Sequence, residues 1–309
     1  MKKVLVTGGC GFIGGHVVEA LLEKEYGVVV VDNRRTGCLI MEHPNVKYEH
    51  RGVVEVTIEE DIDHIIHLAA WSNVRESMEH PFRLYADNVL TTASIMDDIL
   101  QGGLKVKSLV FASSSAVESP ESHYGISKLV SEQMLGIFEE QTGIPCARLR
   151  FANVYGPRQS NIHGTLISNL VECILCGNSP VVYGDGMQGR DYIYVKDVVA
   201  AIILSMEQQL SGALNVSTGV TTSVNGVIKV TSEAAVLLGL SRPIAVYEAA
   251  RAGDKANVFM GLNPELRGHG WRAHMPLRTG IMEQIAWAKA MEGTWKDDHR
   301  PDGSIMKRR

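Results

Sequence analysis

Short apolar runs alternate with longer amphipathic stretches along the first half of the chain. The short runs are rich in valine, isoleucine and leucine, and they predict buried strands at 3–7, 27–32, 62–70, 107–115 and 145–151. Two long stretches repeat apolar residues at helical spacing, which predicts helices over 81–103 and 124–143. Strands that alternate with helices favour an α/β fold with a parallel sheet and right-handed crossovers.

A glycine-rich turn stands between the first two predicted strands. Gly8, Gly11 and Gly14 follow the strand at 3–7 and open an amphipathic helix, and Asp32 ends the next strand. Glycines at these points allow a tight turn, a close approach of the backbone to a pyrophosphate, and close packing of helix on strand. The unit predicts a Rossmann-type dinucleotide site. The alternative is a glycine turn in an α/β fold that binds no ligand.

The acid at the end of the second strand bears on the choice of cofactor. The Asp32 carboxylate can accept hydrogen bonds from a ribose diol, and its charge would repel a 2′-phosphate. NAD is therefore favoured over NADP. Arg34 and Arg35 follow closely, and they weaken this preference.

The pattern changes past residue 155, where loops and short elements replace the regular alternation. Residues 181–195 predict two short strands around a glycine-rich turn. A chain of 309 residues is long enough for two lobes. We expect a doubly wound NAD-binding domain over 1–155 with part of 185–220. A smaller α+β substrate lobe is expected over 156–184 with 221–295, followed by a tail over 296–309.

Composition and charge narrow the classes of partner. A net charge of −5 gives no electrostatic reason to expect binding of nucleic acid. No apolar run approaches the roughly 20 residues that span a bilayer. The five cysteines are scattered and do not resemble a disulfide framework, and the first residues lead directly into a strand with no signal-peptide pattern. These features predict a cytoplasmic location.

Candidate metal ligands are sparse. His64 and His67 lie three apart on a predicted strand, so their side chains point to opposite faces. Cys173 and Cys176 form a single C-x-x-C inside a helical pattern, with no second pair and no neighbouring histidine cluster. The sequence therefore predicts no metal site.

The stretch SSSAVESPESHYGISK at 113–128 carries the candidate chemistry. Tyr124 and Lys128 are four residues apart at the start of a predicted helix, so their side chains share one face. A lysine ammonium near a phenol lowers its pKa, which would let Tyr124 take a hydroxyl proton near neutral pH. Ser114 ends a predicted strand, where ligands bind in open α/β sheets. A tyrosine and a lysine on the surface of any amphipathic helix can have the same spacing. The predicted dinucleotide site is what favours a catalytic role for Tyr124 and Lys128.

With these motifs in place, the chain resembles the extended short-chain dehydrogenases/reductases, in their NAD-dependent sugar-nucleotide epimerase/dehydratase family. Within that family it is most similar to the UDP-glucose 4-epimerases. The resemblance covers nearly the whole chain and rests on the motifs TGGCGFIGGH, VVDNRRTG, IIHLAAWSNVRESMEHP, NVLTT, SLVFASSSAV, YGISK, RFANVYGPRQ, VVYGDGMQGRDYIYVKDVV, LNVSTG, RAGD and GWRAHMPL. These motifs are specific for the family and much less specific for the substrate.

The resemblance implies roles for individual residues. Tyr124 would be the acid/base, Lys128 its partner on the nicotinamide ribose, and Ser114 the catalytic serine, with Ser115 as the alternative. The NAD contacts implied are Gly8, Gly11, Phe12, Ile13, Gly14, Asp32, Asn33, Leu68, Ala69, Ala70, Asn88, Ser113, Tyr124 and Lys128. The UDP-sugar contacts implied are Ser114, Ser115, Tyr124, Asn153, Arg190, Arg251 and Asp254. Two arginines suit a diphosphate, and a carboxylate suits a ribose diol.

The resemblance also implies a reaction. Tyr124 would remove the proton of the sugar 4-hydroxyl while C4 gives a hydride to NAD, and the hydride would return to the opposite face of the 4-keto sugar. Dehydratases of the family typically carry Asp-Glu after the catalytic serine or threonine, and decarboxylases usually carry Ser-Glu. This chain has Ser115-Ala116 and lacks that carboxyl group. Epimerisation needs none, so 4-epimerisation of a UDP-sugar of the UDP-galactose/UDP-glucose type is expected.

Two departures from the family pattern keep other functions open. The loop between Ser114 and Tyr124 is shorter than usual, which would open the sugar site or impair activity. Val53 stands where an aspartate usually contacts the adenine, which would weaken NAD retention. The alternatives are an acetamido- or uronic-sugar epimerase, a dehydratase, or a cofactor-binding homologue without catalysis.

The two long predicted helices, 81–103 and 124–143, resemble the pair that forms a four-helix dimer interface in this family. A homodimer through these helices is therefore expected.

Overall fold

The computed structural model describes residues 1–35, 41–56, 61–102, 104–159, 165–250 and 258–291. The chain forms two compact units, and each is described by itself. Unit 1 comprises Met1–Ala152, Lys196–Ser217 and Gly261–Arg272, and unit 2 comprises Asn153–Val195, Thr218–Met260 and Ala273–Arg309. The division differs from the expected bounds in two places. Residues 153–155 belong to unit 2, and Gly261–Arg272 returns to unit 1, where Trp271 donates its indole N–H to the Asp197 carbonyl (3.0 Å).

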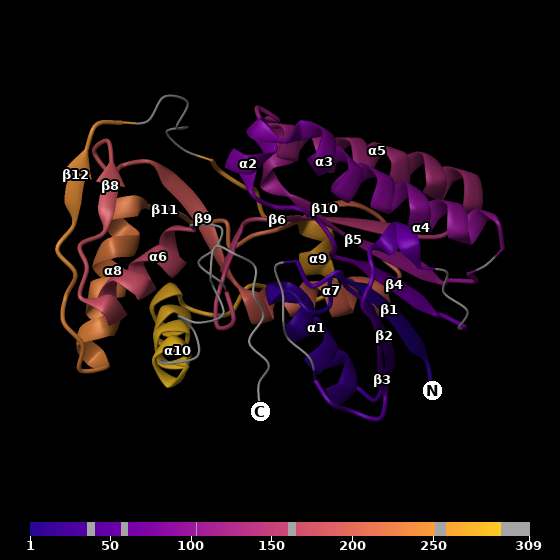
Figure 1. Cartoon of the computed structure of the whole chain (residues 1–309), viewed down its shortest axis with the longest axis horizontal. Coiled ribbons are helices and arrows are strands. Elements are labelled where there is room, and N and C mark those ends of the chain that lie inside the picture. Colours follow the sequence, from indigo (N-terminus) through magenta and orange to yellow (C-terminus); the bar gives the residue numbers. More distant parts are fainter. Residues whose placement is uncertain (36–40, 57–60, 103, 160–164, 251–257, 292–309) are drawn as a thin grey trace. The chain divides into compact units, whose positions relative to one another are not determined.

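Unit 1 is built on a seven-stranded sheet in the order β10-β6-β5-β4-β1-β2-β3, in which every neighbouring pair is parallel. This is the doubly wound, Rossmann-type sheet that the alternating pattern predicted (Figure 1). The edge strands β3 and β10 were not among the predicted strands. The strand bounds are β1 Lys3–Thr7, β2 Gly27–Val31, β3 Val46–Glu49, β4 His64–His67, β5 Ser108–Ser114, β6 Cys146–Phe151 and β10 Gly212–Val216.

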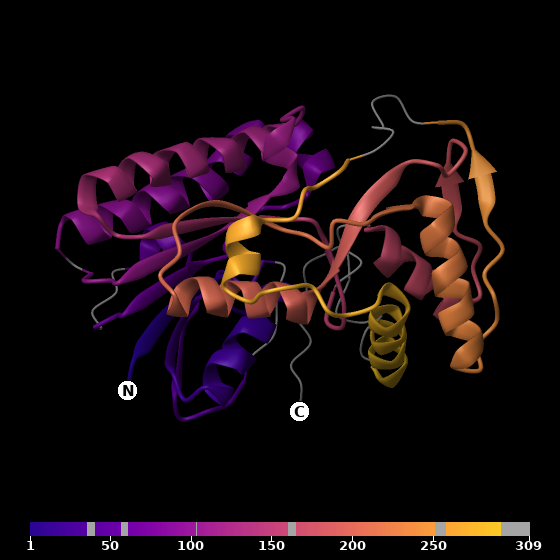
Figure 2. The same cartoon turned by 180° about the vertical axis from the view of Figure 1, so that it is seen from behind.

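Helices cover both faces of this sheet. Figures 1 and 2 show α2, α3, α4 and α5 over one face and α1 with α7 over the other. The helix bounds are α1 Phe12–Glu23, α2 Val74–Glu79, α3 Pro81–Tyr85, α4 Thr91–Leu100, α5 His123–Thr142, α7 Val195–Glu207 and α9 Pro264–Gly268. One turn of π-helix, Ala86–Leu90, joins α3 to α4, and short 3-10 helices span Val53–Glu55 and Ser115–Glu118.

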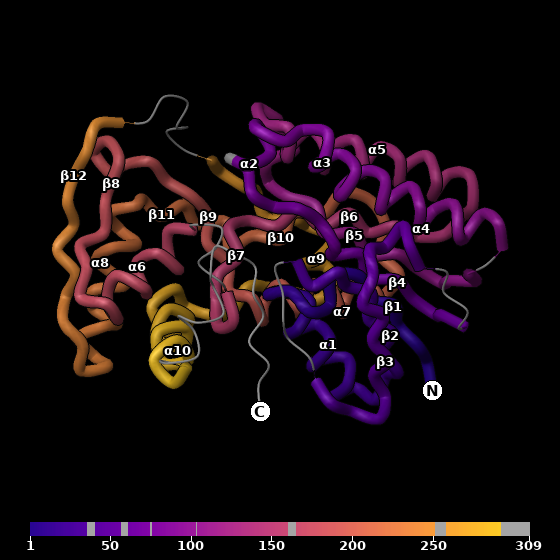
Figure 3. The backbone as a smooth tube through the Cα atoms, viewed as in Figure 1, coloured from indigo at the N-terminus to yellow at the C-terminus, as the bar shows by residue number. Residues whose placement is uncertain are grey.

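The strands at the centre of the sheet are apolar on both faces because helices cover both. All five residues of β2 are buried, and Leu5, Ile65 and Phe111 of the neighbouring strands join a core that also contains Leu135 and Phe138 of α5. Burial on both faces explains why these strands read as continuous apolar runs. The chain path in Figure 3 brings β10 beside β6 late in the sequence, after the first residues of unit 2.

Unit 2 is smaller and mixes short strands with helices. A three-stranded sheet has the order β11-β9-β7, and β12 pairs with β8 in a second sheet. Helix α8 packs against α6 and α10. The bounds are β7 Asn153–Tyr155, α6 Leu166–Cys176, β8 Val181–Tyr183, β9 Gly189–Tyr194, β11 Thr221–Ser223, α8 Val224–Leu237, β12 Val246–Glu248 and α10 Leu277–Ala290. The two strands predicted within 181–195 are β8 and β9, although they belong to different sheets.

In the part of the chain that the structure describes, no helix is long and apolar enough to cross a bilayer.

Candidate active site

The glycine turn after β1 forms the cradle that its spacing predicted. Gly8 has a φ of +72° and Gly11 donates its backbone N–H to the Gly8 carbonyl (3.1 Å), which closes the turn. A Cβ on Gly14 would lie 2.0 Å from that carbonyl oxygen, so only glycine fits there. No side chain caps the first turn of α1, where Phe12 and Ile13 stand. Its backbone N–H groups therefore suit a phosphate, and the residues present fit a bound dinucleotide.

Asp32 lies at the end of β2, beside this turn. Its carboxylate accepts hydrogen bonds from the backbone N–H groups of Cys10 (2.9 Å) and Arg34 (2.6 Å). Burial raises the pKa of the Asp32 carboxyl, and the two backbone hydrogen bonds partly oppose that rise. The side chain is thus held in place as an acceptor, which suits a ribose diol.

The two arginines that follow Asp32 are engaged by other side chains of unit 1. The Arg34 guanidinium contacts the His50 ring, and the Arg35 guanidinium pairs with Asp87 at 2.7 Å. Asn33 accepts a hydrogen bond from the backbone N–H of Arg35 (3.1 Å), which fixes the turn between them. Both guanidinium groups contact side chains of the protein, and this is in keeping with NAD, which has no 2′-phosphate for an arginine to bind, rather than NADP.

The loop after β4 lies against the glycine turn. A Cβ on Gly8 would come within 2.8 Å of the Ala69 backbone nitrogen. The Leu68 N–H donates to the Thr7 carbonyl (3.1 Å), and the Ala69 N–H donates to the Thr7 hydroxyl (3.2 Å). Leu68 and Ala69 are therefore held at the carboxyl edge of the sheet, next to the glycine turn.

The serine and the tyrosine that were singled out in the sequence are brought together. Ser114 ends β5, where its hydroxyl accepts from the Ala116 N–H (3.2 Å), and it lies close enough to the Tyr124 phenol to lower the pKa of that phenol. Helix α5 begins one residue before Tyr124, and its first turn is capped by the Ser122 hydroxyl, which accepts from the Gly125 N–H (3.1 Å). A Cβ on Gly125 would approach the Ala116 carbonyl to 2.9 Å, so the short connecting loop packs tightly under the helix. The short loop therefore leaves Ser114 and Tyr124 close together.

The pKa of the tyrosine differs from the sequence prediction. Burial raises the pKa of the Tyr124 phenol above its ordinary value, and the neighbouring Ser114 hydroxyl lowers it only in part. The charge of Lys128 favours a phenolate, but desolvation of the phenol opposes its formation. The prediction of a lowered pKa is therefore wrong for the protein alone.

Lys128 lies one turn further along α5 and is buried. Its ammonium donates to the Ala112 carbonyl of β5 (2.7 Å) and lies 4.7 Å from the centre of the Phe111 ring. Burial lowers the pKa of Lys128 to about 7, against the opposing effect of the Glu132 carboxylate. The ammonium is thus fixed to the same strand that carries Ser114.

We expect Lys128→Met to increase the free energy of unfolding, and the increase to shrink as pH rises. The unfolded chain keeps the lysine proton up to its ordinary pKa, whereas the folded chain releases it near pH 7. Between these values the unfolded state binds more protons, so the parent becomes more stable with rising pH. The advantage of the variant should fall by about 2 kcal/mol between pH 7 and pH 9. Denaturant unfolding at both values measures this, and an advantage that does not change with pH would contradict the assigned shift.

A buried carboxylate that the sequence prediction missed supports this site. Glu132 is 4% exposed and accepts from the Ser113 hydroxyl (2.5 Å) and from Arg150 through Nε (3.0 Å) and Nη2 (2.7 Å). The Ser113 hydroxyl, expected to contact the cofactor, is thus directed to Glu132. Glu132 follows Lys128 by four residues on the buried face of α5, and this spacing was the only sequence signal of its role.

Asn88 also has a more structural position than expected. Its side-chain oxygen accepts from the Trp71 N–H (2.7 Å), and its amide nitrogen donates to the Trp71 carbonyl (3.1 Å) and the Ser127 hydroxyl (2.9 Å). The π-helical turn at Ala86–Leu90 places it there. Asn88 therefore ties the loop after β4 to the residue that precedes Lys128.

The remaining predicted substrate contacts are divided between the two units. Ser115 begins the 3-10 helix after Ser114 in unit 1. In unit 2, Asn153 donates to the Asp191 carbonyl (3.0 Å) and Arg190 donates to the Gly189 carbonyl (2.7 Å), so the two lie on the paired strands β7 and β9. Arg251 and Asp254 lie outside the described residues. Among the described histidines, cysteines and acidic residues, no group of three or more is placed to hold a metal ion.

Comparison with known proteins identifies the family of this chain. Residues 4–217 match the family described as NAD dependent epimerase/dehydratase. A relative from Methanocaldococcus jannaschii, described as a putative UDP-glucose 4-epimerase, is 32% identical over 307 residues, which cover 93% of this chain and 98% of that protein.

Two solved structures are similar over nearly the full length. The UDP-glucose 4-epimerase of Thermotoga maritima, solved with UDP-glucose, is 30% identical with a TM-score of 0.85, and the match covers 94% of this chain and 99% of that one. The UDP-N-acetylglucosamine 4-epimerase of Methanobrevibacter ruminantium M1, solved with UDP-N-acetylmuramic acid, is 30% identical with a TM-score of 0.86 and the same coverage.

Proposed function

The chain belongs to the NAD-dependent epimerase/dehydratase family, and we propose that it is an enzyme that epimerises a UDP-sugar of the UDP-galactose/UDP-glucose type at C4. One observation carries the proposal. Ser114 lies beside the Tyr124 phenol, with Lys128 one turn further along α5, at the carboxyl edge of a sheet that also holds the glycine cradle. This arrangement can hold and deprotonate a sugar hydroxyl beside a dinucleotide.

Each residue of the pair has a task in this reaction. Ser114 hydrogen-bonds the oxygen of the sugar 4-hydroxyl, and Tyr124 takes its proton and later returns one. Lys128, one turn along the same helix, is assigned to support the phenolate through its positive charge, which would oppose the effect of burial. NAD, which the glycine turn and Asp32 would hold, would supply the hydride acceptor and donor that oxidation and reduction at C4 require. We further propose that Asn153, Arg190, Arg251 and Asp254 bind the UDP part of the substrate.

Epimerisation is preferred over elimination because of the two residues that come after the catalytic serine. These residues, Ser115 and Ala116, carry no carboxyl group that could act as a second acid/base. The closest alternative is a 4-epimerase for an acetamido sugar, which the likeness to the UDP-N-acetylglucosamine 4-epimerase favours. A uronic-sugar epimerase, a dehydratase and a cofactor-binding homologue without catalysis are the remaining alternatives. The intact Ser114 and Tyr124 pair argues against the last of these.

The test is proton NMR of a panel of UDP-sugars incubated with the purified protein and NAD. UDP-galactose, UDP-N-acetylgalactosamine and UDP-glucuronate each give anomeric signals that separate the 4-epimers. We expect conversion of UDP-galactose to UDP-glucose. Conversion of the acetamido sugar alone would move the assignment to that substrate, and no conversion of any sugar would favour the non-catalytic alternative.

The cysteines bear on the compartment. The described cysteines Cys10, Cys146, Cys173 and Cys176 are all free thiols. Free thiols are usual in a reducing compartment, so we propose that the enzyme acts in the cytoplasm.

The outer surface of α3–α5 supports a homodimer. On α5 the exposed residues Ile126, Val130 and Ile137 recur at helical spacing and so share one side of the helix. On the neighbouring run Pro81–Leu100, Phe82 is 88% exposed and Leu90 is exposed as well. An apolar surface of this kind suits a second copy of the chain, and we propose that these helices form a four-helix interface.

Sedimentation velocity at micromolar concentration tests the dimer. The parent should sediment at twice the monomer mass, whereas Val130→Asp combined with Ile137→Asp should sediment as a monomer because two charges would be buried at the interface. Leu237→Asp on α8 is the matched control, since Leu237 is 62% exposed and Ile137 is 67% exposed. A monomeric parent, or a control that also dissociates, would contradict the proposed interface.

A further inference from the structure

Two loops flank the glycine cradle, one on each side of β1. In the sheet β1 lies between β4 and β2, so the loop after β2 and the loop after β4 leave the carboxyl edge on opposite sides of it. Asp32 to Arg35 form the beginning of the first loop, and Leu68 to Trp71 form the second. A side chain that joins these two loops therefore passes the carboxyl end of β1, where the dinucleotide is expected to bind.

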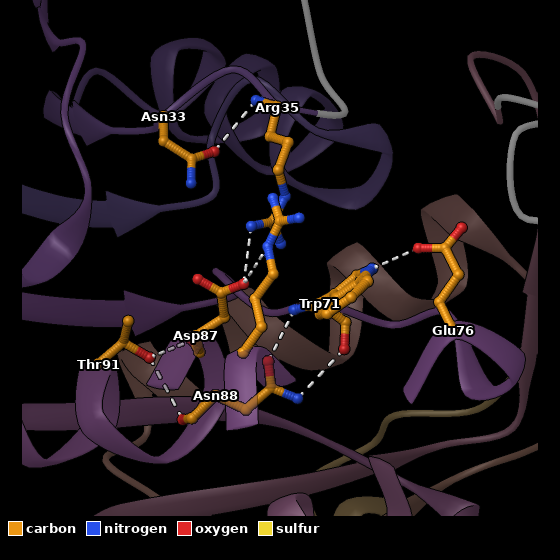
Figure 4. Close-up of polar contacts among 8 residues, drawn as sticks. Asn33, Arg35, Trp71, Glu76, Asp87, Asn88 and Thr91 are labelled. Carbon is orange, nitrogen blue, oxygen red and sulfur yellow. Dashed lines mark hydrogen bonds and ion pairs between the residues drawn. The ribbon is translucent and has the colours of Figure 1, made fainter. Parts of the chain in front are cut away.

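Arg35 makes this connection. Its guanidinium pairs with Asp87 of the π-helical turn at 2.7 Å, and its carbon Cζ lies 5.2 Å from the centre of the Trp71 indole. Figure 4 shows the Arg35 side chain reaching from the loop of Asn33 to Asp87, with Trp71 and Asn88 beside them. The salt bridge is only about 30% exposed on either side, so solvent weakens it less than a fully exposed pair.

Several hydrogen bonds hold the receiving side of this contact in place. The Trp71 backbone is bonded to the Asn88 side chain through both its N–H and its carbonyl, and the indole N–H donates to Glu76 (3.1 Å). Asn88 is bonded in turn to Ser127, the residue before Lys128. Arg35 is thus connected through Trp71 and Asn88 to α5, the helix that carries Tyr124 and Lys128.

We propose that Arg35, held by Asp87 and stacked on Trp71, is a strap that holds Asp32 to Arg35, at the end of β2, beside bound NAD and slows its release. The inference rests on NAD as the cofactor and does not depend on which sugar is the substrate. Arg35 would be a positioning residue, since it acts through the loop that carries Asp32. The strap would also offset the weaker retention expected from Val53, which packs against the apolar core in this structure.

The chain offers a closely matched control for the strap. Arg83 lies over the same indole, with Cζ 5.1 Å from the ring centre, and it is 3.9 Å from the same Asp87 carboxylate. Arg83 and Asp87 belong to the same helical run, so this contact joins no two loops. Arg35→Gln and Arg83→Gln each remove one positive charge and one cation–π contact, but only the first cuts the connection between the loops.

The experiment measures the rate of NAD release from the purified protein in the absence of any sugar. NAD is allowed to bind, the protein is diluted into an enzymatic trap for free NAD, and the release rate is followed. We expect Arg35→Gln to release NAD about tenfold faster than the parent and Arg83→Gln to stay within about twofold. Arg35→Lys should fall between them, because it keeps the charge and loses the planar stack.

Equal release rates for the parent and both glutamine variants would overturn the strap. Equal acceleration by both variants would overturn it too, because it would assign the effect to loss of charge near Trp71. Failure of the proposed reaction is a separate result, seen as absence of UDP-sugar conversion by a parent that still holds NAD. Thermal unfolding of the three proteins without NAD should agree closely, which excludes general destabilisation as the cause of faster release.

Discussion

Tyr124→Phe should lower kcat for the UDP-sugar by about a thousandfold while leaving NAD bound, within the range that a positioned acid/base contributes. The phenol lies beside Ser114, and it is the group to which the proposed reaction assigns the proton transfer. Removing one hydroxyl should change the free energy of unfolding by only about 1 kcal/mol. Steady-state kinetics, with the NAD content of the purified variant measured in parallel, tests this expectation.

The matched control is Tyr85→Phe. The Tyr85 hydroxyl, at the end of α3, is hydrogen-bonded to the ring of His123 (3.0 Å), the residue before Tyr124 in α5. Tyr85→Phe therefore removes the same chemical group next to the first turn of α5. We expect its kcat to stay within about threefold of the parent, since no proton transfer is assigned to it. A Tyr124→Phe enzyme that retains more than a tenth of the parent activity would refute the assigned role of the phenol.

Gly14→Ala should cost about 3 kcal/mol or more in the free energy of unfolding and should abolish NAD binding. The new methyl group would meet the Gly8 carbonyl oxygen at 2.0 Å and the Gly9 Cα at 2.7 Å, and both are backbone atoms that no rotamer change can move. The cradle must therefore open. Denaturant unfolding and the nucleotide content of the purified protein measure the two effects.

Gly268→Ala separates this clash from the general effect of replacing a glycine. A Cβ on Gly268, at the end of α9, meets no atom within 4 Å. We expect its free energy of unfolding to stay equal or to rise by less than about 1 kcal/mol, because alanine restricts the unfolded chain. Similar losses at both positions would show that the packing of α1 on the glycine turn is not the cause.

The cofactor half of the site was predictable from the sequence because its requirements are local. The positive φ of Gly8 and the close contact of Gly14 with the Gly8 carbonyl arise within a few residues of chain, and the spacing to Asp32 follows from one strand–helix–strand unit. Ser114 and Tyr124 were predictable for a related reason, since the end of a strand and the start of a helix fix their positions.

The features that the sequence prediction missed depend on contacts between distant elements. No sequence pattern marks the π-helical turn at 86–90. In the structure this turn accompanies the hydrogen bond between Asn88 and the backbone of Trp71. Glu132 has the appearance of an ordinary solvent-facing acid on an amphipathic helix, and only the fold shows that Arg150 of β6 reaches it. The raised pKa of Tyr124 has the same origin, because desolvation depends on what surrounds the ring after folding.

The measurement that tests the central claim most directly is the reaction carried out in D2O and followed by proton NMR, beginning with UDP-galactose. Transient oxidation at C4 moves one hydrogen from the sugar and returns the same hydrogen, so UDP-glucose should form with protium at C4 and no deuterium at any carbon. Deuterium at C5, or a product that has lost water, would show that a proton is removed from carbon, and it would contradict 4-epimerisation by hydride return.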